Sequence, residues 1–357
     1  GVVKGDLSMT GAITKPVISG IVSTVKTGIV DKVKVKTASG KFDFVTADST
    51  VTFRDIRGTA AVGGEVRGAG KILIGDDNLG RKTQVDFNFR TGNAPGDSLA
   101  RIYNIPTSSF QVGKVAATAN LSGTPETLRT LVKFNAPQAT YPATGDVIVN
   151  RDRSVSFRDV ALAVAGGTAL ATGSWNQQRW QAVANTKGIK INRFVSKEQL
   201  EKVNLDSANF NGKVIVSGTS TPFKIGQIKT ENADIKVAGG RVAVTRVKFD
   251  EQKFSAELVA DKVQVGRLLK NSIPINGPLS GKFQVSGSRD NFNAETLRIQ
   301  GDASLAAAGG RITANNIQVK DGIYLARIRT NNLQLQQLSQ QIPKSFKGKL
   351  NGDFDVA

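Results

Sequence analysis

The sequence predicts an all-β protein built on a long antiparallel sheet, and three observations indicate this class. Short stretches alternate apolar and polar residues with a period of two, as in LSGKFQVSGSRDNF, where Leu279, Phe283 and Val285 share one parity and Ser280 and Lys282 the other. Glycine is frequent, with 37 residues, and proline is scarce, with 10, as expected for strands joined by many turns. Stretches of the same kind also recur along the chain. Together these features predict strands of one reused type.

The recurrence divides the chain into modules. The pairs Gly239-Gly240 and Gly309-Gly310 lie 309 − 239 = 70 residues apart, and each opens a GGR sequence followed by a second apolar stretch. Upstream, TVTFRDIRGTAAVGG from Thr50 matches SVSFRDVALAVAGG from Ser154. Repeated units of this size bury their apolar faces by stacking on their neighbours. We therefore predict one continuous repetitive body over residues 1–357, with approximate modules 1–110, 111–209, 210–278, 279–345 and, as the start of a further module, 346–357.

In chain order, the first modules are predicted to be mostly strands. The runs 33–36 and 41–44 alternate, and Ser39-Gly40 between them predicts a hairpin turn. Three or four strands follow over 50–90, the clearest with Val85, Phe87 and Phe89 on one face. Pro95-Gly96 interrupts the pattern before a short helix near 97–103, and strands resume over 112–184.

Short amphipathic helices are predicted before each later repeat of the LSG-type strand. The first spans 192–203, where Ser196 followed by Gln199 forms a capping-box pattern. Shorter counterparts are predicted at 265–271 and 335–342. Nearby, the parity of the apolar residues shifts over 259–263, which indicates a β-bulge. We expect the helices to cap or plug an edge of the sheet.

The residue types argue against catalysis. The chain has neither His nor Cys, which excludes Ser-His and Cys-His nucleophile pairs and zinc sites built on imidazole or thiolate. The loop GGEVRGAGK departs from a phosphate-binding loop at Glu65 and Ile72. The pair Asp76-Asp77 lacks the spacing of a calcium loop and predicts a hairpin turn instead. We therefore expect a protein that is not an enzyme and that carries no cofactor and no metal.

A formal net charge of +19 raises the question of an anionic partner. Basic residues such as Lys34, Lys36 and Lys41 alternate with apolar ones, so the charge lies on the polar faces of strands. Nucleic-acid binding by stacking needs aromatic residues on that same face, and the Phe residues take the opposite parity. Nucleic acid is thus disfavoured, whereas a basic outer face that aids solubility or attracts anionic lipid headgroups agrees with the pattern.

The apolar face of such a sheet must be covered. With few helices available, the sheet either folds over into a packed sandwich or curls into a trough with an apolar interior. An open trough would expose far more apolar surface than soluble proteins tolerate, and its ligand would carry long hydrocarbon chains.

Specific stretches resemble a known family. The strand LSGKFQVSG from Leu279, the run from Ala306 to Ala357, and the order of a short helix before an LSG strand resemble the repetitive β-rich body of the TamB and AsmA-like family, in particular its large cyanobacterial members and the related envelope-spanning translocon component of plastids. The resemblance implies a β-taco, a long curled antiparallel sheet with an apolar groove. It also implies a periplasmic location with an inner-membrane anchor, which we expect outside this segment.

Two functions from different classes follow from that resemblance. The first is bridge-like transport of phospholipid or other acyl lipids between the inner and outer membranes, in support of outer-membrane biogenesis. The alternative is a scaffold or chaperone that assists outer-membrane protein assembly or protein translocation together with an Omp85-type barrel, by pairing strand edges with an extended client. A conduit requires an apolar face that continues through all modules, whereas a scaffold needs only one accessible strand.

The conduit hypothesis predicts which side chains line the groove. The alternative for each is an ordinary core position. The predicted lining residues are Val33, Val35, Phe42, Phe44, Val85, Phe87, Phe89, Val214, Val216, Ile235, Val237, Val242, Val244, Phe283, Val285, Leu350, Phe354 and Val356.

Overall fold

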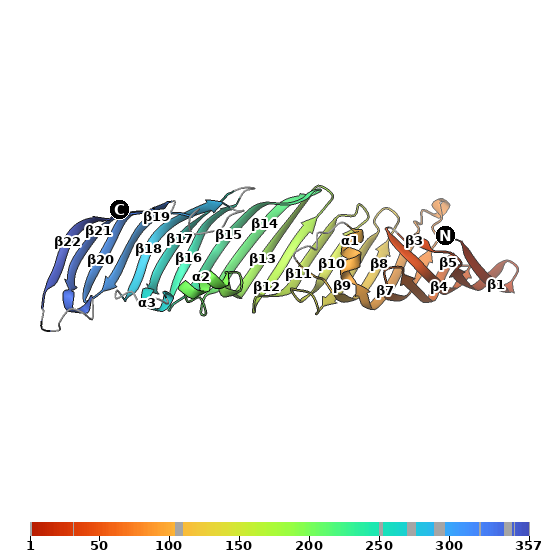
Figure 1. The fold of residues 1–357 in the computed structure, drawn as a ribbon. Coiled ribbons are helices and arrows are strands. Elements are labelled where there is room, and N and C mark those ends of the chain that lie inside the picture. The colour runs from red at the N-terminus through yellow and green to blue at the C-terminus, as the bar shows by residue number, and fades with distance from the viewer. Residues whose placement is uncertain are drawn as a thin grey trace. The chain divides into compact units, whose positions relative to one another are not determined.

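The alternating stretches form strands along the whole chain (Figure 1). The structure is a computed structural model, and it describes residues 2–30, 32–103, 110–249, 253–269, 276–288, 297–320, 323–338, 345 and 347–356. The strands belong to one antiparallel sheet of 22 strands that is not closed, as predicted for the fold class. They are β1 (Val3–Ala12), β2 (Lys15–Thr24), β3 (Gly28–Val30), β4 (Val33–Val45), β5 (Thr50–Ala60), β6 (Glu65–Leu73), β7 (Gln84–Pro95), β8 (Lys114–Gly123), β9 (Arg129–Ala136), β10 (Ala143–Asn150), β11 (Val155–Val164), β12 (Gly167–Trp175), β13 (Arg179–Lys190), β14 (Asn209–Ser220), β15 (Phe223–Val237), β16 (Gly240–Phe249), β17 (Lys253–Gln264), β18 (Pro278–Ser288), β19 (Arg298–Ala307), β20 (Gly310–Lys320), β21 (Ile323–Gln334) and β22 (Lys349–Val356).

The chain forms two units, each built on the same meander. The first comprises Gly1–Ala163, Ala171–Trp180 and Ser220–Phe223, and the second comprises Val164–Leu170, Gln181–Thr219 and Lys224–Ala357. In the first unit each strand from β4 to β11 pairs with its neighbours in sequence; upstream, β2 pairs with both β1 and β4, and β3 pairs with the start of β4. In the second unit β15 to β22 pair consecutively. The predicted module boundaries remain a prediction.

The first glycine of each repeated pair lies in a tight hairpin turn, and the second begins the next strand. Between β15 and β16, Ala238 and Gly239 have φ of 48° and 79°, and between β19 and β20, Ala308 and Gly309 have φ of 46° and 71°. Two successive residues with positive φ define the turn whose twist matches that of the flanking strands. The 70-residue spacing of these pairs therefore repeats one hairpin geometry.

β-Bulges recur at residues with positive φ. The register shifts between Phe53 and Ile56 in β5, where Asp55 has φ of 52°, and between Ala260 and Val263 in β17, where Lys262 has φ of 53°. Asp159, the counterpart of Asp55 in the FRD repeat, also has φ of 52°. The bulge predicted over 259–263 is confirmed, and the FRD repeat marks a conserved geometry within the chain.

The hairpin predicted at Ser39-Gly40 is wrong. Both residues lie inside the 13-residue strand β4. Gly40 is buried and lies opposite Val22 of β2, so the strand continues through it instead of turning. A Ser-Gly pair within a strand has the same local sequence as a turn, and only the pairing with β2 and β5 distinguishes the two.

The helices are short. The helix predicted near 97–103 is confirmed as α1 (Gly96–Ile102). The predicted 192–203 helix is only partly formed, as the 3₁₀ helix η2 (Ile191–Arg193) and α2 (Lys197–Lys202), and Leu200 N donates to Ser196 O over 3.1 Å. The two later helices are α3 (Val265–Leu268) and η3 (Leu335–Gln337); residues 270–271 and 339–342 of those predictions lie outside the described residues. A further 3₁₀ helix, η1 (Asp77–Leu79), forms the turn predicted at Asp76-Asp77.

Asp97 ties α1 to the start of the next segment. Its carboxylate accepts hydrogen bonds from Val112 N at 2.7 Å and Gly113 N at 3.0 Å. These two backbone donors hold the pKa of Asp97 below its ordinary value. The ionised carboxylate therefore stabilises the connection between β7 and β8.

We expect Asp97→Asn to lower the urea midpoint of unfolding at pH 7, because the amide offers one acceptor oxygen where the carboxylate offers two. Since the folded pKa is depressed, the stabilisation is present above the unfolded pKa of about 3.9 and is lost as the pH falls through the folded value. The gap between wild type and variant should close at low pH. Asp77→Asn is the matched control, since the described residues make no hydrogen bond to its side chain. A gap independent of pH would contradict the role of the charge.

Candidate functional site

In the second unit the apolar side chains of neighbouring strands lie directly opposite one another. One row crosses all eight paired strands without a polar or charged residue. A parallel row on the same face includes Val244, Leu258 and Phe283. The first row, from β15 to β22, is Ile235, Val242, Ala260, Gly281, Ala303, Ala314, Ile328 and Phe354. The apolar face is thus continuous across this unit.

In the first unit the apolar face carries a ladder of aromatic rings. Phe42 and Phe53 have ring centroids 6.4 Å apart, Phe53 and Phe87 5.5 Å, and Phe87 and Phe89 5.8 Å with nearly parallel planes. We call these four residues the phenylalanine ladder. It joins β4, β5 and β7 on one side of the sheet, and β6 passes beneath it with glycine at the matching positions, Gly68 and Gly70.

The phenylalanine rings lie over glycines of the neighbouring strand. A Cβ atom on Gly70 would stand 2.4 Å from Cδ1 of Phe87, and one on Gly68 would stand 2.4 Å from Cδ1 of Phe89. In the second unit, Cβ atoms on Gly301 would lie 3.0 Å from Cδ1 of Phe283. Each pair is directly opposite in register. The ring therefore covers backbone that has no side chain, the arrangement known as aromatic rescue of glycine.

The predicted lining residues are mostly half-buried. Two of them are buried, Val237 at 7% exposure and Val244 at 8%, and two are exposed, Phe354 at 43% and Val356 at 44%. The other fourteen, including Val214 and Val216 of β14, are intermediate. Side chains of a closed core would be almost fully buried. The groove assignment of these residues remains a prediction.

A bulge brings Val33 and Val35 onto the same face as Phe42 and Phe44. The β4–β5 register shifts between Val35 and Thr37, where β4 carries one extra residue. An extra residue exchanges odd and even positions, so the odd-numbered valines and the even-numbered phenylalanines share a side. The sequence analysis assigned all four residues to the groove lining, but it did not identify the bulge that puts them on one face.

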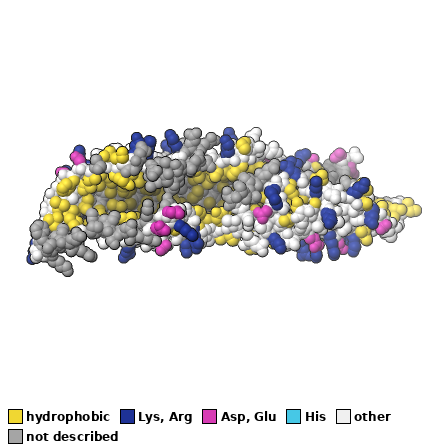
Figure 2. Space-filling view, viewed as in Figure 1, with side chains coloured by type: hydrophobic (Ala, Val, Ile, Leu, Met, Phe, Trp, Pro, Cys, Tyr) yellow, Lys and Arg dark blue, Asp and Glu magenta, His cyan; other side chains and the backbone are white. Residues whose placement is uncertain are grey.

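Much of the apolar surface is not covered by a second layer. The accessible surface of the chain is 22,817 Å², whereas a compact monomer of 37.9 kDa exposes about 14,000 Å². Figure 2 shows, over the second unit at the left, a hollow with hydrophobic side chains inside it and Lys and Arg side chains along its margins. Among the described residues, Leu333 is the one large side chain that is less than 2% exposed.

The second unit has a small buried cluster beside its short helical segments. Ala208, Val237, Ala238, Ala260 and Val263 form a buried cluster. Partly buried residues of the helical segments and adjoining strands pack against it, and Asn204 N donates to Leu268 O over 2.7 Å. The helical segments η2 and α3 therefore pack against the sheet through Ile191 and Leu268, while the predicted capping of a sheet edge stays a prediction. The partly buried residues are Ile191, Leu205, Ile235, Val242, Leu268 and Phe283.

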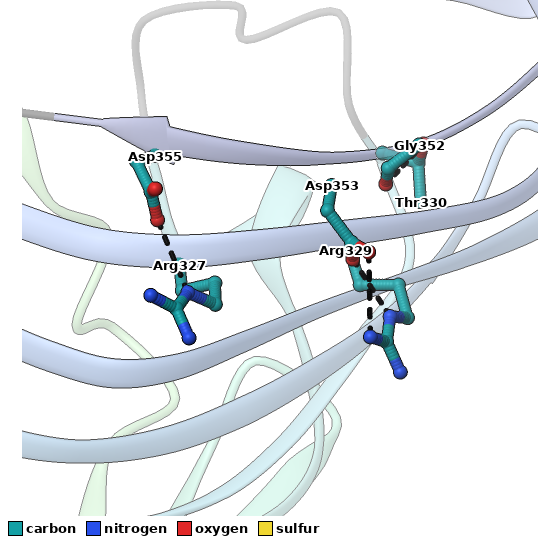
Figure 3. Close-up of polar contacts among 6 residues, drawn as sticks. All are labelled: Arg327, Arg329, Thr330, Gly352, Asp353 and Asp355. Carbon is teal, nitrogen blue, oxygen red and sulfur yellow. Dashed lines mark hydrogen bonds and ion pairs between the residues drawn. The ribbon is translucent and has the colours of Figure 1, made fainter.

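The opposite face of the second unit is polar and carries ion pairs across strands. Arg329 Nε donates to Asp353 Oδ1 at 2.7 Å and Arg327 Nε to Asp355 Oδ1 at 3.2 Å (Figure 3). Each arginine lies directly opposite its aspartate in the register of β21 and β22. The Arg329 guanidinium holds the pKa of Asp353 below its ordinary value. Opposite charges placed in this way stabilise the pairing of the two strands.

Sequence reasoning missed several members of the apolar face. Phe53 lies at the centre of the phenylalanine ladder. It belongs to the FRD repeat, which the sequence analysis used only as evidence for repeated modules. Leu258 and Ile299 lie opposite the predicted residues Phe283 and Val285. Their alternation with polar neighbours is the signal that would have identified them.

Comparisons with known proteins give limited similarity. No family model matches the chain, and no solved structure does. The chain is similar to the protein named TIC236, chloroplastic, from Arabidopsis thaliana, with 30% identity over 133 residues. These cover 35% of this chain and 6% of that protein. The similarity agrees loosely with the family resemblance of the sequence repeats. In the part of the chain that the structure describes, no helix is long and apolar enough to cross a membrane.

We expect Gly70→Ala to lower the free energy of unfolding by about 1–3 kcal/mol, because the added methyl group displaces the Phe87 ring and meets the backbone oxygen of Asp86. Gly58→Ala, on the adjacent strand, is the matched control. Its added Cβ would meet nothing closer than Thr37 O at 3.8 Å, and we expect a change within about 0.5 kcal/mol. Urea unfolding followed by far-ultraviolet circular dichroism measures both. Equal effects of the two substitutions would show that the rings do not depend on the glycines.

Proposed function

We propose that the apolar face of the sheet binds the acyl chains of phospholipids and conducts them, as part of a bridge between two membranes. The observation that supports this most directly is the apolar row that crosses β15 to β22 on a face that is only half-buried. An apolar face of that extent is too large to be left to water. The proposed function is not enzymatic.

The chemistry of the face suits movement as well as binding. Val, Ile, Ala and Phe side chains stabilise an acyl chain by desolvation and dispersion, at about 25 cal/mol for each Å² buried. They form no directional bonds that would fix the chain at one place. Ladder rings that lie over glycines also leave room above the sheet that standing side chains would occupy. Headgroups would remain at the basic margins of the hollow.

The cellular setting of this proposal rests on the resemblance of the repeats and on the similarity to TIC236, a chloroplast protein by its name. We propose that the segment lies in the periplasm between inner and outer membranes, that segments outside it contact those membranes, and that it supports outer-membrane biogenesis. The chain spans about 6% of that relative, so these statements concern a whole protein of which this segment would be one part.

The test is native mass spectrometry with lipid extraction on the 357-residue chain purified without detergent. We expect copurifying phospholipid that is lost in Val285→Asp, because a carboxylate on the apolar face cannot be desolvated without cost. Gln284→Asp is the matched control, since it adds the same charge to the next residue of β18, on the other face. Circular dichroism checks that both variants keep the sheet.

Two outcomes would contradict lipid conduction. Equal phospholipid in both variants would place the lipid elsewhere than on the apolar face. A folded wild-type protein that copurifies with no lipid and takes up no fluorescent phospholipid would leave the apolar face without acyl ligands. The second outcome would favour the scaffold that pairs its strand edges with a client protein, together with an Omp85-type barrel.

A further inference from the structure

On the polar face of the first unit, basic side chains lie directly opposite one another. The register places Arg57 of β5 opposite Arg67 of β6, and Arg67 opposite Arg90 of β7. It continues through Thr118 of β8 to Lys133 of β9. We call Arg57, Arg67, Arg90 and Lys133 the basic row. Figure 2 shows several Lys and Arg side chains gathered over this unit, at the right.

The basic row departs from the pattern of the polar face in the second unit. There, Arg329 lies opposite Asp353 (Figure 3) and Arg246 opposite Glu257. The second unit also places Lys236 opposite Arg241, but Arg241 Nε donates to Asp234 Oδ2 at 2.7 Å. Like charges directly opposite one another destabilise strand pairing. A local rule broken without structural compensation is characteristic of functional positions.

Nearby carboxylates neutralise only part of the basic row. Glu65 accepts hydrogen bonds from Arg67 at 2.8 and 3.4 Å. Asp55 is engaged by Lys41 at 3.0 Å, outside the row. Within the described residues no carboxylate lies within 4.0 Å of the side-chain nitrogens of Arg57, Arg90 or Lys133, although Asp146 is opposite Lys133 in register. Among the described residues, these three exposed cations therefore form no ion pair. Arg57 still contributes, after Lys41, to the lowered pKa of Asp55 and, after Arg67, to that of Glu65.

The row lines two adjoining hollows of about 560 and 840 Å³. Both are bounded by Arg67, Arg90 and Lys133, and Thr118 contributes a hydroxyl. In the smaller one, Asn88 Oδ1 accepts a hydrogen bond from Asn120 Nδ2 at 3.1 Å. This bond leaves the side-chain NH2 group of Asn88 available to donate to a ligand. These volumes are of the size that binds small ligands. Basic side chains and neutral donors therefore line both hollows, together with one carboxylate in each, Asp55 in the smaller and Glu65 in the larger.

We propose that the basic row is a binding site for a phosphate group, either free or on a lipid headgroup. Guanidinium groups bind phosphate oxygens in pairs through parallel N–H donors. Arg57 and Arg90 offer such donors from β5 and β7, while Arg67 between them adds positive charge although two of its N–H groups are engaged by Glu65. A phosphate between them would also relieve the repulsion of the row. Nucleic acid is a poorer ligand, because stacking needs aromatic rings among the charges, whereas Phe87 and Phe89 alternate with Arg90 and lie on the opposite face.

The site is independent of acyl-chain conduction. Its side chains project from the face of β5 to β9 opposite the phenylalanine ladder, so the two proposals can fail separately. A phosphate held here would attach the outer face of the segment to an anionic surface or solute, whatever the apolar face carries.

The test compares two double variants of the 357-residue chain. Arg57→Gln with Arg90→Gln removes the unpaired arginines, and Arg327→Gln with Arg329→Gln removes two arginines that are paired with aspartates. Both variants lose the same charge. Binding of pyrophosphate is measured by calorimetry, and binding of phosphatidylcholine vesicles with and without phosphatidic acid by co-sedimentation, with polyglutamate as a competitor that has charge but no phosphate.

We expect wild type to bind at least one phosphate probe, the first variant to lose about tenfold or more in affinity, and the second to lose about twofold or less. Binding of pyrophosphate alone identifies a free phosphate as the ligand, and binding of the vesicles alone identifies a headgroup. The first variant should also unfold at an equal or higher urea concentration, since like charges are removed. Equal losses in both variants, displacement by polyglutamate at equal charge concentration, or no binding of either probe would each overturn the proposal.

Discussion

The register of the strands is the constraint on which the rest of the structure depends. Because side chains alternate between the two faces, a slip of one residue would move a whole strand's apolar set to the polar side. The bulges at Asp55, Lys262 and Asn332 each absorb an extra residue at a position with positive φ. Beyond the bulge in β17, Val263 lies opposite Leu279, and that row continues to Leu305. The bulges therefore keep the apolar residues on one face even where a strand has one residue more than its partner.

An apolar face that is to hold a ligand must be continuous and also unfilled. The phenylalanine rings that lie over Gly68, Gly70 and Gly301 satisfy both conditions, because they cover backbone with apolar surface without a facing side chain beneath them. Because the rings cover backbone and are not themselves covered by a second layer, few side chains are fully buried. The sheet is stabilised by its hydrogen-bonded ladders and by contacts between adjacent strands, as in repeat proteins in which each unit contacts its neighbours. The buried cluster beside η2 and α3 is a local exception.

Local sequence predicted those features that depend on local geometry. Alternation identified the strands, the pair Asp76-Asp77 identified a turn, and the parity shift over 259–263 identified a bulge. Features that depend on which residues face each other were not predicted. Ser39-Gly40 was taken for a turn because its pairing with β2 was unknown. Phe53 was missed for a related reason, since its role comes from ring contacts with Phe42 and Phe87 on other strands.

The basic row was invisible in the sequence because its members are far apart along the chain. Arg57, Arg67 and Arg90 come together only through the β5–β6 and β6–β7 registers, and a net charge of +19 spread over many strands gives no hint of one row. The same three strands carry most of the phenylalanine ladder on their other face. Each aromatic pair contributes about 0.5–1.5 kcal/mol beyond the area it buries. The ladder thus strengthens the pairing of the same strands that the like charges weaken on the other face, although its rings are only half-buried.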